Sequence, residues 1–184
     1  VGARYLQACT GMTLMQIKEN PKAAWDMYGK IRNNIFLKDV TGKDMGWVES
    51  VCKSYKPDIV VLDMGDKFAT TQGFARTDEA LKANVVYARQ IAKMYECAMF
   101  YMSQLSADAE GKIQLNQAMM EGSRTGKAAE ADLMILIAKN PPVEGVNGEE
   151  ESTQRHLNVV KNKLSGWHGR IICELDYRTA RYTA

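Results

Sequence analysis

Short apolar runs separated by helical patterns dominate this chain, and the most informative run is 59–62 (IVVL). Pro57 precedes the run and Asp63 ends it. A short run rich in β-branched residues predicts a buried strand of a parallel sheet. Ligands of open α/β sheets bind outside the carboxyl ends of such strands. The pattern therefore predicts that Asp63 lies at the mouth of a site; the alternative is a strand that simply ends in a solvated acid.

Helical spacing of apolar residues predicts the elements on either side of this strand. Two short helices over 2–10 and 13–19 are separated by Gly11, and Asn20 before Pro21 is typical of a helix start. The other helices are expected in three segments: from Gly42–Asp44 as far as Pro57, from Thr77 as far as Tyr95, and over 123–130.

The order of the elements predicts the fold class. Further strands are expected at 34–37, 97–102 and 131–138, and a terminal hairpin at 153–161 and 170–175. Strands that alternate with helices predict an α/β fold. We expect a mostly parallel sheet flanked by helices, with a C-terminal antiparallel hairpin.

The composition limits the class of protein. A length of 184 residues suits one domain, and a net charge of +2 means that any basic patch must be local. The four cysteines show no CxxC spacing and the two histidines lie far apart, so we expect reduced thiols and no histidine-based metal site. No run approaches the roughly 18 apolar residues of a membrane span, and no signal peptide is visible. We expect a cytoplasmic protein with no membrane partner.

Several weak motifs follow one another in an informative order. Asp63 ends one predicted strand, Ser103 and Gln104 end the next, and Lys161 and Lys163 precede the turn of the hairpin. In this order and at these intervals the motifs resemble the RecA-like core of DnaB-type replicative helicases, including the phage primase-helicases. The resemblance covers most of the chain, from about residue 4 onward.

The resemblance implies a nucleotide site that uses ATP and Mg2+. Asp63 matches the Walker B acid, which holds the nucleotide-bound metal ion in such ATPases. Gln104 matches the polar sensor of the γ-phosphate; the alternative is a strand-end residue that satisfies backbone groups. Lys161 and Lys163 match the basic pair that reaches the ATP of the neighbouring subunit in a hexameric ring; the alternative is protection of an edge strand. The family usually has arginine at the second position, and Lys163 departs from it because lysine lacks the planar fork. Tyr177 is a candidate for stacking on the nucleotide base, with ordinary packing as the alternative.

The resemblance also implies a partner, single-stranded DNA. Residues 105–122 lack clear periodicity, and irregular segments of this length in compact domains are commonly functional or mobile. They match the loop that grips single-stranded DNA in the family. Lys112, Asn116, Arg124 and Lys127 are the candidate DNA contacts, because such side chains position phosphates. Ordinary solvated charges are the alternative interpretation.

One motif of the family is missing. A phosphate-binding loop needs G-x-x-x-x-G-K-[ST], and the nearest match, 122–128, has three residues between its glycines and Ala128 in place of the hydroxyl. The chain also begins at Val1 rather than at methionine. We expect residues 1–184 to be an N-terminally truncated part of a RecA-like core, inactive when isolated.

Two functions remain open at this point. The first is ATP-dependent DNA unwinding by a hexameric replicative helicase of a bacterial or phage-infected cell. The second is a RecA-like DNA-binding ATPase of recombinase or regulatory type without helicase activity. A response-regulator-like binding domain is disfavoured, because no pair of acids lies near an N-terminal strand.

Overall fold

The computed structural model describes residues 2–70, 77–121, 124–145, 148–150 and 152–183. The N-terminal region is helical, with α1 (Gly2–Thr10), α2 (Leu14–Glu19) and α3 (Pro21–Gly29). Two larger helices, α4 (Met45–Tyr55) and α5 (Thr77–Met94), flank the first strands, and α6 (Arg124–Glu130) is short. Local rules explain where several of these helices begin. Thr13 forms a capping box at α2, and the Asn20 side chain accepts from the Ala23 backbone N–H at α3, as the sequence predicts.

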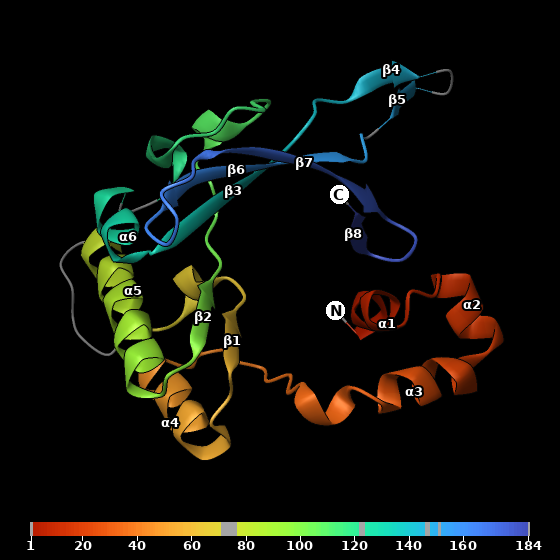
Figure 1. The fold of residues 1–184 in the computed structure, drawn as a ribbon, viewed down its shortest axis with the longest axis horizontal. Coiled ribbons are helices and arrows are strands. Elements are labelled where there is room, and N and C mark those ends of the chain that lie inside the picture. Colours follow the sequence, from red (N-terminus) through yellow and green to blue (C-terminus); the bar gives the residue numbers. More distant parts are fainter. Residues whose placement is uncertain (1, 71–76, 122–123, 146–147, 151, 184) are drawn as a thin grey trace.

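The central strand pairs with its predicted neighbour. Strand β1 (Ile59–Leu62) runs parallel to β2 (Ala98–Tyr101), with Ile59 opposite Ala98. Helices α4 and α5 cover one face of this pair (Figure 1). The core between them consists of side chains from both helices, β1 and the segment after it: Met45, Val48, Cys52, Leu62, Phe68, Ala88 and Ile91. Helix cover on a parallel pair is what the α/β pattern predicts.

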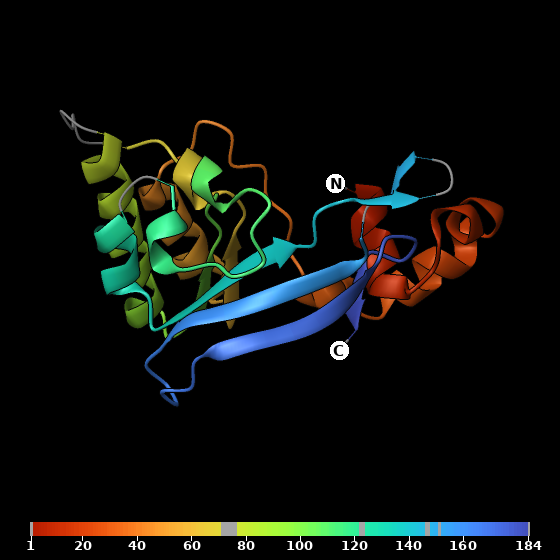
Figure 2. The same ribbon diagram turned by 90° about the horizontal axis from the view of Figure 1, so that it is seen from above.

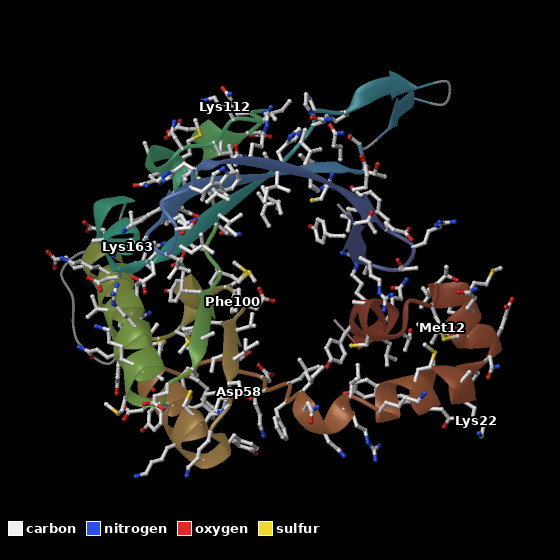
Figure 3. The ribbon with its side chains drawn as sticks, in the orientation of Figure 1. Met12, Lys22, Asp58, Phe100, Lys112 and Lys163 are labelled. Carbon is white, nitrogen blue, oxygen red and sulfur yellow. The ribbon has the colours of Figure 1, made fainter. Side chains whose placement is uncertain are left out.

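The opposite face of the parallel pair is bare. Ile59 and Val61 of β1 are 60% and 55% exposed, and Phe100 of β2 is 52% exposed. Figure 3 shows Phe100 on the side of β2 away from α5. Parallel strands are ordinarily buried on both faces, because crossover helices pack on each side. The exposed face is therefore an apolar surface that this part of the chain leaves uncovered.

An antiparallel sheet forms the second layer of the fold. Its strand order is β3-β6-β7-β8, and its members are β3 (Leu133–Lys139), β6 (Gln154–Asn162), β7 (Gly169–Asp176) and β8 (Arg181–Thr183). The predicted hairpin is confirmed as β6 and β7. The antiparallel part is larger than expected, because the predicted strand 131–138 joins it through β6 rather than extending the parallel pair. A separate small hairpin pairs β4 (Val143–Gly145) with β5 (Gly148–Glu150).

The long strands link the two ends of the molecule. Figures 1 and 2 show β6 and β7 running from α6 toward the N-terminal helices. There the Arg181 guanidinium donates to the Ala8 carbonyl at 2.9 Å, and the Gln7 side-chain amide donates to the Arg178 carbonyl. The C-terminal strand therefore holds α1 in place through backbone acceptors. The predicted α/β class, with parallel strands, flanking helices and a C-terminal antiparallel hairpin, is confirmed.

One predicted strand is wrong. Residues 34–37 contain the end of a 3-10 turn, Arg32–Asn34, followed by irregular backbone. The Phe36 ring packs against Tyr55 at 4.9 Å between centroids, yet Phe36 stays 59% exposed. A strand forms only where a neighbouring backbone offers hydrogen bonds. Among the described residues, no strand pairs with this segment.

The buried His156 predicts acid sensitivity of the antiparallel sheet. Its Nε2 lies 2.8 Å from the Asn140 side-chain oxygen, and burial, assisted by the charge of Arg170, holds the pKa of His156 below its ordinary value of 6.5. Below pH 6.5 the unfolded chain takes up a proton that the folded chain resists. Stability is therefore lost as the pH falls from that value toward the lowered pKa. His156→Gln should lose less stability between pH 7.5 and 5.5 in urea titrations. An equal loss in both proteins would contradict this assignment.

Candidate functional site

Two predicted site residues follow the ends of adjacent parallel strands. Asp63 comes directly after β1 and is exposed, and Gln104 follows β2 and is also exposed. Because β1 and β2 are parallel, their carboxyl ends meet at one edge. After Asp63 the chain turns sharply at Met64, which has a φ of 55°, and the Gly65 N–H donates to the Met102 carbonyl at 2.9 Å. A side chain on Gly65 would collide with the Tyr101 ring, so glycine permits this turn beside β2.

A buried cation joins this edge to α6. Lys127 is 3% exposed, and its ammonium contacts Asp66 Oδ2 at 2.7 Å, Ser103 Oγ at 2.8 Å and the Glu121 carbonyl at 2.9 Å. Ser103 in turn donates to Asp66 Oδ2 at 2.5 Å. Asp66 also accepts from the Tyr101 hydroxyl, at 3.2 Å, and burial together with this carboxylate raises the pKa of Tyr101. Three N–H groups of one ammonium are thus used inside the protein.

This placement corrects the prediction for Lys127. A lysine that contacts DNA phosphates must present its ammonium to solvent, whereas Lys127 directs its donors to internal acceptors. Sequence reasoning missed Asp66 and Ser103 as its partners. The available signal was weak: Asp66 stands three residues after Asp63, and Ser103 directly precedes Gln104. Nothing local pairs either of them with a lysine so far along the chain.

The irregular segment after β2 is a loop whose two ends are hydrogen-bonded to each other. We call this paired base, residues 104–106 and 119–121, the neck of the loop. The Glu121 N–H donates to the Gln104 carbonyl at 3.2 Å, and the Ser106 N–H donates to the Met119 carbonyl at 2.8 Å. Leu105 and Met120 form an isolated antiparallel bridge between these two bonds. Lys127 holds the Glu121 side of the neck through its carbonyl. The residue predicted to sense phosphate therefore lies in the neck of the loop predicted to bind DNA.

The body of the loop packs on the antiparallel sheet. Leu115 and Met120 are buried against Met134 and Leu136 of β3. The buried Asn158 of β6 donates to the Ile113 carbonyl at 3.0 Å. These contacts give the loop a defined shape despite its lack of periodicity, because its backbone groups find partners on β6.

A shallow groove runs between the loop and the hairpin. Its volume is about 530 Å³, and its polar lining includes Gln114 and Asn116 from the loop and Arg170 from β7. The Asn116 side-chain oxygen accepts from the Ala118 N–H at 2.9 Å, and the residue is exposed. Lys112 is exposed on the outer side of the loop (Figure 3). Arg170 is exposed as well, and sequence reasoning did not single it out.

Arg124 opens α6 directly after the loop, but its side chain lies outside the described residues, as do Gly122 and Ser123 of the imperfect phosphate-loop match. The remainder of that match forms helix α6, with Ala128 buried in the core beside β3. The described part of the match thus consists of helix and contributes to packing.

Lys161 and Lys163 approach the C-terminal end of α6. Both ammonium groups lie within 3.4 Å of the Ala129 carbonyl, and Lys161 also donates to the Ala128 carbonyl. Carbonyls at a helix end carry partial negative charge, which favours cations there. Burial and the neighbouring Lys163 lower the pKa of Lys161. Lys163 is 46% exposed, lies 3.5 Å from Asp132 Oδ1 and is labelled beside α6 in Figure 3. The two lysines thus approach the same carbonyl from the hairpin.

Tyr177 does not join the Asp63 edge within the chain. It lies in the turn between β7 and β8, at the opposite end of the sheet from α6 (Figure 1). Its hydroxyl bonds with the Arg155 guanidinium, which also lies 5.5 Å from the ring centroid. This contact is a cation–π arrangement that occupies one face of the ring.

The described residues supply one candidate metal ligand at this edge. Asp63 offers one exposed carboxylate, which suits Mg2+ because this ion is commonly held by one or two carboxylates plus phosphates and water. No group of three or more metal-ligating side chains occurs in the described portion of the chain. A phosphate cradle of backbone N–H groups is not encoded in the sequence. Asp63 thus fits the role of a single carboxylate ligand to such an ion.

Comparison with known proteins at the level of sequence finds no relative. No family model matches the chain, and no curated protein matches it either. No helix within the described ranges is long and apolar enough to cross a membrane.

Two solved structures are similar over nearly the whole chain. One is a DnaB-like replicative helicase, described with its primase interactions, with a TM-score of 0.76 and 16% identity over 98% of this chain and 46% of that protein. The other is an ATPase domain, with a TM-score of 0.81 and 16% identity over 97% of this chain and 68% of that domain. The resemblance predicted from the motifs is confirmed at the level of the fold. The chain therefore has the RecA-like fold of DnaB-type helicase ATPase domains and spans about half the length of the DnaB-like helicase.

Proposed function

We propose that this chain is part of an ATP-driven DNA-unwinding motor of the hexameric, RecA-like replicative type. The observation that carries the proposal is the shared edge of β1 and β2. Asp63 follows β1 and Gln104 follows β2 at that edge, and the neck of the irregular loop begins at Gln104 itself. A nucleotide-dependent shift of the backbone at this edge would therefore move the surface loop directly, because Gln104 belongs to both.

The complete RecA-like core, in this proposal, includes a further part that covers the parallel pair. Ile59, Val61 and Phe100 expose an apolar face that parallel sheets normally bury. The similar ATPase domain is matched over 68% of its length, so the remainder of that domain has no counterpart in this chain. The corresponding part of the complete protein would supply the phosphate cradle, which the present sequence lacks.

Each residue has a role set by its position. Asp63 would hold Mg2+, and bound Mg2+ neutralises charge on the phosphate oxygens. Gln104 would hydrogen-bond to the γ-phosphate at the same edge. Because its carbonyl accepts from the Glu121 N–H, a shift of Gln104 would also move the neck of the loop. Lys161 and Lys163 would serve the site of the adjacent subunit, and Lys163 is the better placed because it is half exposed. Tyr177, in the turn between β7 and β8, would stack on a base bound to an adjacent subunit.

Single-stranded DNA is the proposed polymer. Lys112, Asn116 and Arg124 flank or belong to the loop, and Arg170 adds a guanidinium to the groove beside Asn116. Cationic and amide side chains of this kind contact phosphates without reading sequence. A replicative motor that advances along any sequence requires this type of contact.

The second candidate is a RecA-like DNA-binding ATPase of recombinase or regulatory type. The Asp63 edge serves it equally well. The long β6–β7 hairpin, with two lysines on one side near its turn, favours the helicase, because it offers cations to a neighbouring subunit.

Asp63→Asn in the complete protein should abolish most ATP hydrolysis. The amide keeps the shape but loses the charge that faces the metal, and we expect a loss above about tenfold, equivalent to roughly 1.4 kcal/mol of barrier. The matched control is Asp58→Asn, at the amino end of the same strand (Figure 3). Steady-state hydrolysis rates compare the two variants. Activity of Asp63→Asn within about twofold of wild type would identify Asp63 as a plain strand end.

Lys112→Ala combined with Arg170→Ala should weaken single-stranded DNA binding and flatten its salt dependence. Each lost phosphate contact reduces the slope of log K against log salt by roughly 0.7. Lys53→Ala with Lys93→Ala removes the same charge from exposed sites on α4 and α5 and serves as control. Fluorescence anisotropy titrations at several salt concentrations give the slopes. If both double variants behave alike, the DNA lies elsewhere.

Lys163→Ala in the complete oligomer should lower the hydrolysis rate far more than nucleotide affinity. A cation supplied by a neighbour acts on transition-state charge, while the exposed pair with Asp132 is worth little. Lys163→Arg should preserve or raise activity, because the fork fits phosphate better. Nucleotide titrations and turnover measured on the same samples separate the two effects. Equal losses of affinity and turnover would remove Lys163 from the neighbour's site.

A further inference from the structure

The least solvent-exposed charge near the candidate site belongs to a residue that the proposed chemistry does not use. Lys127 is 3% exposed, and its partner Asp66 retains 16% side-chain exposure. Their charged atoms lie 2.7 Å apart, within a network that also contains Ser103 and the Glu121 carbonyl. Burying an ammonium is costly unless it is paired and hydrogen-bonded, and here its contacts meet that condition.

The network joins four segments that have separate predicted roles. Asp66 lies in the short turn after Asp63, and Ser103 directly precedes Gln104. Glu121 closes the neck of the loop, where its N–H also donates to the Gln104 carbonyl. Lys127 itself lies in α6, which follows the loop. One ammonium therefore contacts the segments that follow both parallel strands and the exit side of the loop.

This geometry restricts how the segments can move. If the exit side of the neck shifts, the Glu121 carbonyl leaves the ammonium or carries it along. In the second case Lys127 pulls on Asp66 and Ser103, which are close in sequence to Asp63 and Gln104. Ion pairs in a low-dielectric interior are short and directional, so small shifts change their energy steeply. Apolar side chains of the same volume would fill the space without that directional constraint.

We propose that Lys127 is a positioning residue that couples the loop to the Asp63 and Gln104 edge, through Asp66 and Ser103. The inference rests on the proposed function, because it assigns the coupling path within that motor. Lys127 contacts neither nucleotide nor DNA in this account. It fixes the relative positions of the groups that do.

The test compares hydrolysis by the complete protein with and without single-stranded oligo-dT. The main variant replaces the buried pair by apolar groups of similar size, Lys127→Met with Asp66→Leu, so that no unpaired charge is left inside. We expect basal hydrolysis to persist while the stimulation by DNA falls on the order of tenfold, within the ~5- to ~150-fold range of typical coupling. The matched control is Arg89→Met, which removes another cation bound at α6 but distant from the neck.

Two milder variants guard against a simple loss of folding. Ser103→Ala removes one acceptor and keeps the ion pair, and Lys127→Arg keeps the charge; both should reduce stimulation less than the apolar pair does. Hydrogen exchange supplies a second readout that a purely structural role would not move. On DNA addition, wild type should change protection both in the loop and at the amides after Asp63, whereas the apolar pair should change only in the loop.

The outcomes are distinguishable. Wild-type stimulation that survives intact in all Lys127 and Asp66 variants overturns the coupling role and leaves the proposed function standing. A second contrary result is that a variant loses basal and stimulated hydrolysis equally, while DNA still changes hydrogen-exchange protection both in the loop and after Asp63. That result shows a structural role and also overturns the coupling role. A wild-type protein that neither hydrolyses ATP nor binds oligo-dT overturns the proposed function, and this inference with it.

Discussion

The buried ion pair between Lys127 and Asp66 is the constraint on which the site depends. It links the segments after the two parallel strands to α6 through charge, and its partners Asp66 and Ser103 are close in sequence to Asp63 and Gln104. Apolar replacements of buried ion pairs are often as stable as the pairs themselves, so we infer that this pair serves mainly to fix positions. Its value here is geometric: it keeps the ends of two strands and the neck of one loop in a single arrangement.

The need of strands and apolar faces for a neighbour explains two features: the exposed face of the parallel pair and the wrong strand prediction at 34–37. Helices α4 and α5 bury one face, and the other exposes Ile59, Val61 and Phe100. Residues 34–37 have the composition of a strand but no described partner, so they remain irregular with Phe36 exposed. Both features have the same physical account, in which strand backbones and apolar faces require a neighbour. A larger core would provide that neighbour for both.

The sequence predicts those parts of the fold that are set by local patterns. The strand at 59–62, the cap at Asn20 and the β6–β7 hairpin follow from periodicity, capping chemistry and turn residues, and they are confirmed. The burial of Lys127 could not be predicted, because its partner Asp66 lies 61 residues away and the helix around it is rich in small and charged residues. The closed neck of the loop was hidden for the same reason, since long-range backbone pairing leaves no periodic trace.

Strand displacement from a forked duplex tests the central claim most directly. Two forked duplexes are tested separately, one for each polarity of the single-stranded tail. With ATP and Mg2+, the complete protein should release the labelled strand from at least one of them. No release should occur with a non-hydrolysable ATP analogue or with the Asp63→Asn protein. Release of the strand under the first condition alone is the predicted result. ATP hydrolysis that is stimulated by single-stranded DNA but displaces no strand from either fork would contradict the helicase assignment and favour a RecA-like DNA-binding ATPase.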